Sequence, residues 1–76
     1  MERFFFNHRD AKGDVEIDID GIMFPSLNTA LEEASFAAHA LVEHADEPAS
    51  GCFEIEDSGR RLMARVPYAV ADDAEA

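Results

Sequence analysis

Basic residues are few in this chain, and its longest helical segment contains none of them. The 76 residues include six Lys or Arg against 17 Asp or Glu, which gives a formal net charge of -11. Proteins that bind nucleic acid concentrate Lys and Arg on one surface, because neutralising phosphate charge supplies most of their affinity. We therefore expect no binding to nucleic acid, and the same negative charge disfavours binding to anionic membranes.

Cysteine and long apolar runs are also scarce. Cys52 is the only cysteine, so an intramolecular disulfide is excluded. The aromatic run Phe4-Phe5-Phe6 is much too short for the core of a secretory signal or for a membrane span. We therefore expect a cytoplasmic protein that forms one small domain.

Two pairs of strand-like segments flank one helical segment. Residues 3–9 are rich in aromatics, and residues 15–19 alternate apolar with acidic side chains, the period-two pattern of a half-buried strand. Two further strands are predicted at 53–56 and 62–66, joined by the tight-turn sequence Asp57-Ser58-Gly59-Arg60. The segments thus form two predicted hairpins.

The helix is predicted over residues 27–45. At about 100° per residue, an apolar stripe that contains four alanines falls on one face and can sit close to a sheet. Its members are Leu27, Ala30, Leu31, Ala34, Ala38, Leu41, Val42 and Ala45. Ser26 is a suitable N-cap, and Thr29 followed by Glu32 offers an alternative start as a capping box.

These segments predict an α+β fold of order ββαββ, a four-stranded antiparallel sheet with the helix packed on one face. The helix-facing side of the sheet is expected to carry Phe4, Phe6, Val15, Ile17, Ile19, Phe53, Ile55, Leu62, Ala64 and Val66. On the other side each hairpin pairs a basic strand with an acidic one, so the charges largely cancel. We assign residues 1–68 to this domain and expect residues 69–76 to form a disordered acidic tail.

Several stretches together resemble one family of proteins. They are the opening RFFFNHRD, the short acidic strand ending in DG, the segment FPSLNTALEEA and the closing hairpin with RVPY. They are similar to the uncharacterised bacterial set called domain of unknown function 6894, and the resemblance extends to about Tyr68. It implies a small cytoplasmic bacterial protein without functional residues to carry over.

A shorter stretch has a second resemblance. DGIMFPSLNTALEEA, from Asp20 to Ala34, is similar to the hinge of HicB-type antitoxins. This resemblance implies a module that binds a toxin or dimerises. The chain departs from the HicB pattern because it lacks the Gly-Cys insertion after the Pro-x-Leu turn.

The sequence offers no clear constellation for catalysis, cofactor binding or metal binding. His39 and His44 lie about 140° apart on the predicted helix, so they cannot ligate one metal together from it. A nucleophilic Cys52 needs a nearby base, and an enzyme would need His8, Cys52 and Tyr68 to converge. We expect no enzyme, no cofactor and no metal site.

Three hydrophobic side chains do not fit the predicted core. Phe5 is expected on the charged face of the sheet beside Met63, and Phe36 lies opposite the apolar stripe of the helix. Aromatic and Met side chains are enriched at the centres of interfaces, so these three are candidate interface residues.

The leading hypothesis from the sequence is therefore a non-enzymatic module that forms a homodimer or binds another protein. The alternatives are a HicB-like module that binds a toxin, a small enzyme, and a sheet that binds RNA. The last would use Phe5 with arginines of the same face to stack and hold single-stranded RNA.

Overall fold

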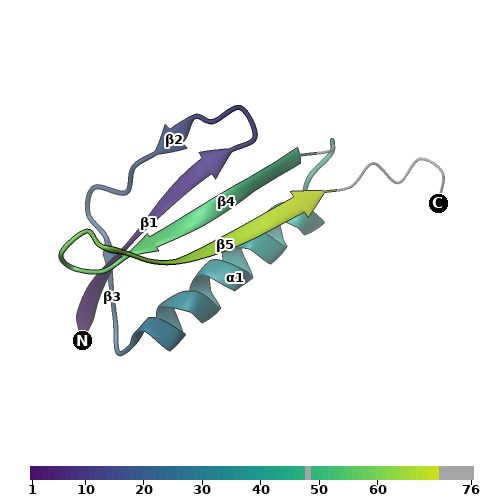
Figure 1. Cartoon of the computed structure of the whole chain (residues 1–76). Coiled ribbons are helices and arrows are strands. Elements are labelled where there is room, and N and C mark those ends of the chain that lie inside the picture. Colours follow the sequence, from purple (N-terminus) through teal and green to yellow (C-terminus); the bar gives the residue numbers. More distant parts are fainter. Residues whose placement is uncertain (48, 71–76) are drawn as a thin grey trace.

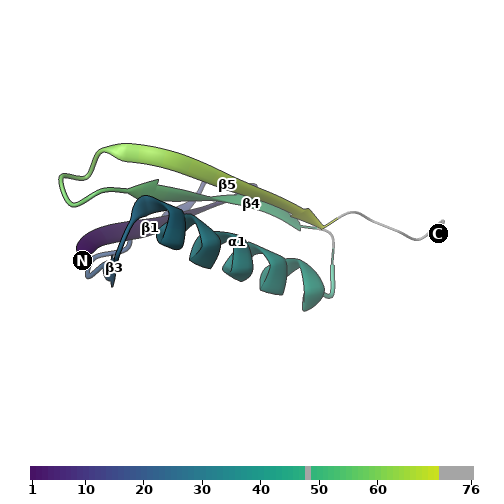
Figure 2. The ribbon, with the colours of Figure 1, turned by 90° about the horizontal axis from the view of Figure 1, so that it is seen from below.

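One antiparallel sheet and one helix make up the structure, and the helix packs against one face of the sheet. A computed structural model describes residues 1–47 and 49–70 of the chain. In chain order the elements are β1 (Glu2–Asp10), β2 (Val15–Glu16), β3 (Ile22–Phe24), α1 (Leu27–Glu43), β4 (Ala49–Glu56) and β5 (Leu62–Val70). Figure 1 gives their arrangement, and Figure 2 shows the sheet and the helix as two layers. The predicted α+β class is confirmed.

The strands follow one another in the order β2-β1-β4-β5, so that β1 and β4 form the central pair. Phe6 pairs with Ile55, and Ile55 pairs with Ala64. Paired residues project to the same face of a sheet, so the core-facing side chains of three strands lie in one layer. Phe4 and Ile55 are fully buried in this layer against Ala30 and Ala34 of α1.

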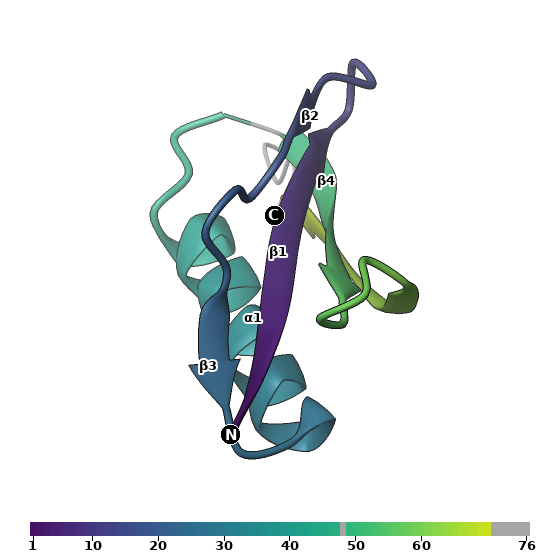
Figure 3. The ribbon, with the colours of Figure 1, turned by 90° about the vertical axis from the view of Figure 1, so that its left-hand side faces the viewer.

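The predicted strand over residues 15–19 is interrupted. Between the paired residues Phe4 and His8, β1 has three residues, whereas the returning chain has five between Glu16 and Ile22. Residues 17–21 therefore bulge away from β1. Pairing resumes in β3, which the sequence did not predict and which lies along the same edge of β1 as β2 (Figure 3).

Three residues of the β2 segment and the bulge that were predicted in the core lie outside it. Val15, Ile17 and Ile19 are exposed, with 76% of the Ile19 surface open to solvent. Their assignment to the core is wrong. Val15 pairs with Arg9 and so projects to the face opposite the helix, and after Glu16 the chain leaves the ladder, so that Ile17 and Ile19 no longer follow the pleat of the sheet.

A second irregularity moves Leu62 away from the core. The register of β4 and β5 shifts after Ile55, so that Ile55 pairs with Ala64 but Glu56 pairs with Leu62. The extra residue in β5 is Met63, and such a bulge reverses the side to which the next side chain points. Leu62 is exposed, and its predicted place in the core is wrong.

The helix begins where the sequence predicts and ends slightly earlier. Ser26 is the N-cap, and its Oγ accepts a hydrogen bond from the Thr29 backbone N–H at 3.3 Å. The helix ends at Glu43, with His44 as the C-cap, rather than at residue 45. α1 packs chiefly against β5, and less against β4, β1 and β3.

β5 continues past the predicted domain boundary. Ala69 and Val70 belong to the strand, and the rest of the predicted tail, residues 71–76, lies outside the described residues. Within the described chain β4 is the only neighbour of β5, so Pro67 lies in an edge strand, where a missing N–H is tolerated. Among residues 1–47 and 49–70, no helix is long and apolar enough to cross a membrane.

Candidate functional site

Phe5 lies on the face of the sheet opposite the helix, as the alternation predicts, but it is covered. Only 8% of its surface is exposed. The guanidinium of Arg60 lies over its ring, with Cζ 3.6 Å from the ring centroid. Gly21 approaches from the bulge, where a Cβ would lie 3.0 Å from Phe5 Cε1. The prediction that Phe5 is an exposed aromatic is therefore wrong.

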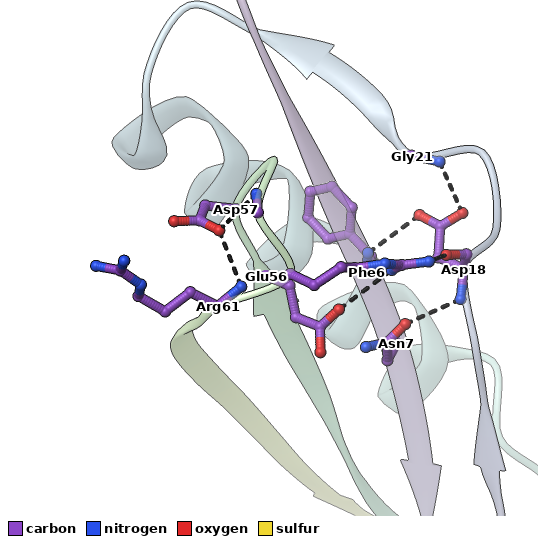
Figure 4. A network of polar contacts seen from close by, with 9 residues as sticks. Phe6, Asn7, Asp18, Gly21, Glu56, Asp57 and Arg61 are labelled. Atoms are coloured by element: carbon purple, nitrogen blue, oxygen red, sulfur yellow. Dashed lines mark hydrogen bonds and ion pairs between the residues drawn. The ribbon is translucent and has the colours of Figure 1, made fainter.

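Asp18 holds the bulge against β1 (Figure 4). Its carboxylate accepts hydrogen bonds from the backbone N–H groups of Phe6 and Gly21, both at 3.0 Å. The side-chain oxygen of Asn7, which is buried, accepts from the Asp18 backbone N–H at 2.9 Å. Arg60 donates to the backbone oxygen of Asp18 at 2.9 Å. Asp18 thus satisfies backbone groups that an uninterrupted strand would have paired.

On the same face, charge is balanced around Glu54. Its Oε2 lies 3.4 Å from Arg9 Nε and 3.3 Å from Arg65 Nε. Burial raises the pKa of Glu54, but hydrogen bonds from the two guanidinium groups outweigh it and hold the pKa below its usual value. The predicted cancellation of charge across the β4–β5 hairpin is confirmed at Glu54 and Arg65.

Of the three residues that an enzyme would need to converge, two do so. His8 Nε2 and the Tyr68 hydroxyl are 2.6 Å apart, and the two rings stack with centroids 5.7 Å apart. Cys52 pairs with Arg9 and so projects to the opposite face, where its Sγ contacts the backbone oxygen of Phe53 at 3.5 Å. The pair on the helix side therefore has no thiol beside it.

In the His8–Tyr68 pair, the Tyr68 side is a phenol rather than a phenolate. Burial, with a smaller contribution from the negative charge of Asp10, raises the pKa of Tyr68, so the phenol stays protonated near neutral pH. Within residues 1–47 and 49–70 no group of three or more His, Cys, Asp or Glu side chains is arranged to hold a metal ion.

A groove opens beside this pair, on the helix side of the sheet. Its volume is about 590 Å³, and it is lined by Phe6, His8, Glu16, Ile17, Asp18, Leu41 and Phe53. The aromatic floor comes from β1 and β4, where the ring centroids of His8 and Phe53 are 5.0 Å apart. Ile17 from the bulge and Leu41 from α1 form its sides and are 53% and 43% exposed.

A smaller recess continues the groove towards the β1–β2 turn. It has a volume of about 280 Å³ and is lined by His8, Asp10, Asp14, Val15 and Glu16. In the turn, Asp10 Oδ1 accepts hydrogen bonds from the backbone N–H groups of Lys12 and Asp14 at 2.9 and 3.0 Å. His8 and Glu16 line both hollows, so the recess is the acidic end of one continuous surface.

The other two candidate interface residues are exposed as predicted. Phe36 has 74% of its surface open on the outer side of α1, and Met63 is exposed at the β5 bulge. Neither lines the groove. Their role in an interface stays a prediction.

Sequence reasoning missed the groove because it placed Ile17 in the core and left Leu41 in the buried stripe of the helix. A signal was nevertheless present. A helix with its side chains is about 10–12 Å wide, whereas four strands spaced about 4.8 Å apart are wider than that. One helix therefore cannot cover the apolar face of four strands.

Comparison with known proteins places the whole of this sheet and helix in one family. The model of a domain of unknown function, DUF6894, matches residues 3–69. The chain belongs to this family. The DUF6894 match omits only the first residue of β1 and the last residue of β5 among the strands and the helix, and thus includes the groove, the acidic recess and the residues around Glu54. No curated protein and no solved structure matches the chain, and the resemblance to HicB-type antitoxins gains no support from these comparisons.

Proposed function

We propose that this DUF6894 protein is a non-enzymatic interaction module that binds another polypeptide chain in the groove between β1, the bulge and α1. The observation that carries this proposal is the uncovered part of the apolar sheet face. Ile17 and Leu41 stand exposed at the sides of a floor made of aromatic rings. Gathered apolar side chains of this kind mark interaction sites on soluble proteins.

The contacts at the other candidate sites support this proposal over its alternatives. Cys52 lies across the sheet from His8 and Tyr68, so the pair lacks the nucleophile that an enzyme would need. Arg60 covers Phe5, which removes the stacking surface that an RNA-binding sheet requires. Within this proposal the protein works in the cytoplasm, where the free thiol of Cys52 stays reduced.

The proposal is tested by photo-crosslinking in the source cell. A phenylalanine analogue with a photoreactive benzophenone replaces Ile17 in one variant and, as the matched control, Arg65 in another. Both positions are exposed, but Arg65 lies on the opposite face of the sheet. We expect an adduct of discrete mass from position 17 and none from position 65.

The mass of the adduct identifies the kind of partner. Twice the mass of the chain means a second copy, and any other discrete mass means a different protein. No discrete adduct from position 17, or the same adducts from both positions, would contradict the proposed function.

Phe36 offers a separate surface for self-association. If a homodimer forms through the outer side of α1, replacing Phe36 with Glu converts it to a monomer, because a charge would be buried at the contact. Light scattering of the wild type and of F36E measures this directly. The same mass for the wild type and F36E would exclude Phe36 from a homodimer interface.

A further inference from the structure

The carboxylates that pair with arginine in this chain do not line the groove. Within residues 1–47 and 49–70 the ion pairs of arginine lie on the opposite face of the sheet or at the β4–β5 turn: Arg9 and Arg65 with Glu54, and Arg60 with Glu56. The groove side keeps its negative charge uncompensated by arginine.

Three carboxylates, those of Asp10, Asp14 and Glu16, line the recess at the end of the groove. None of them takes part in an ion pair among the described residues, and this includes pairs with Lys12, which lies in the same turn. We call these three residues the rim carboxylates. The surface therefore joins an aromatic floor to an anionic rim.

A partner in the groove cannot bind by adding a strand to β1. The edge of β1 beside the groove is already occupied by β2 and β3, and Asp18 holds the Phe6 N–H between them. A ligand chain must therefore offer side chains rather than backbone. An amphipathic helix presents apolar side chains on one face and charged ones at its margins, and it binds in hydrophobic grooves in this way.

We propose that the groove binds the apolar face of a cationic amphipathic helix of a partner protein, whose Lys or Arg side chains lie over the rim carboxylates. This inference rests on the proposed function and adds the chemistry of the partner. A second copy of the chain fits poorly, because its own helix carries only acidic charges and each copy has a net charge of -11.

The test uses three synthetic 18-residue peptides and fluorescence anisotropy. The first contains Lys and Leu placed so that the Leu side chains form one helical face. The second has the same composition in an order that spreads Leu around the helix, and the third replaces every Lys of the first with Glu. We expect the first peptide to bind the wild-type protein at least about tenfold more tightly than the other two.

Two double variants distinguish the contribution of the rim carboxylates to peptide binding from that of the net charge. D14N/E16Q removes two rim carboxylates, and the matched control E32Q/E33Q removes two exposed carboxylates from the helix, so that the net charge changes equally. We expect D14N/E16Q to weaken binding of the first peptide by about three- to tenfold and the control by less than about twofold. Circular dichroism of each variant confirms that the fold is unchanged.

The outcomes that overturn the inference differ from those that overturn the proposed function. If both double variants weaken binding equally, or if the first two peptides bind equally, the peptides are attracted only by the net charge of the protein. Equal binding of the Lys and Glu peptides, lost in L41E, would leave the groove as a binding site but refute a cationic partner. If the protein forms a dimer through the groove and these peptides dissociate that dimer, the occupant is a second copy. That result would also refute a cationic partner.

Discussion

The carboxylate of Asp18 binds two backbone N–H groups, of Phe6 and of Gly21, at the point where the edge of β1 has no strand beside it. A buried N–H group without a partner costs about 1–3 kcal/mol, so this one side chain stabilises the interrupted strand. Gly21 is needed in the same place, because its φ is +71° and a Cβ would lie 2.8 Å from the Phe4 backbone oxygen.

We predict that D18A lowers the free energy of unfolding by about 2–3 kcal/mol, because two backbone N–H groups lose their acceptor. D20A removes the same charge two residues away, where the side chain is exposed, and should change stability by less than about 0.5 kcal/mol. Urea unfolding followed by circular dichroism measures both. Equal losses for the two variants would show that the hydrogen bonds of Asp18 contribute nothing beyond its charge.

For Phe5, the alternation of apolar and polar residues predicts the face of the sheet on which the ring lies but not its burial. Period-two spacing placed it correctly on the face away from the helix, where the structure also has Asn7 and Arg9. Its burial depends on Arg60, which is 55 residues away in sequence, and on a bulge that returns over β1. No local pattern encodes a cover that comes from so far along the chain.

At the scale of elements, the strands and the helix were predictable because each has a clear hydrophobic period and clear end signals. Ser26 fixed the start of α1, and the Asp57–Arg60 turn fixed the second hairpin. The two bulges were not predictable, because an inserted residue leaves the alternation on either side intact. They account for the exposure of Ile17, Ile19 and Leu62, and Ile17 is one side of the groove.

Tyr68 of β5 contacts His8 of β1 across the intervening strand β4, at the position of Gly51. Tyr68 reaches His8 because Gly51, which pairs with Tyr68, has no side chain between them. A Cβ on Gly51 would lie 2.7 Å from Tyr68 Cζ and 2.8 Å from the backbone oxygen of Arg9. Neither neighbour can move freely, because one is backbone and the other is a ring held by its hydrogen bond.

We therefore predict that G51A destabilises the fold by about 1–3 kcal/mol through overpacking. G59A is the matched control, because the nearest atom to its new Cβ is Asp57 Oδ1 at 3.5 Å, an ordinary contact. It should change the free energy of unfolding by no more than about 0.5 kcal/mol. Thermal and urea unfolding measure both variants, and a neutral G51A would mean that Tyr68 does not lie across Gly51.

For the whole molecule, charge is distributed unequally between the two faces of the sheet. The face opposite the helix balances Glu54 with two arginines, whereas the groove side carries the rim carboxylates. Because the pKa of Glu54 is lowered in the folded state, its contribution to stability is complete above its ordinary value of 4.5. That contribution is lost as the pH falls through the folded-state pKa, which lies below 4.5.

We predict that E54Q is less stable than the wild type at pH 7 and that the difference becomes smaller towards pH 3, because acidification below 4.5 moves the wild-type carboxylate towards its protonated form. E33Q, on the exposed outer side of the helix, should differ from the wild type by a similar amount at both pH values. Urea midpoints at pH 7 and pH 3 provide the comparison. A difference for E54Q that does not change with pH would refute this role of Glu54.

Pro67 affects how readily copies of the protein can associate through the exposed edge of β5. A nine-residue edge strand is a template on which identical chains can stack without limit into fibres. Pro67 removes one N–H donor from the middle of that template, and on the far side of the sheet β2 and β3 are only two and three residues long. Along the described residues, neither edge of the sheet therefore offers a long unbroken row of donors to a neighbouring copy, which disfavours growth into fibres.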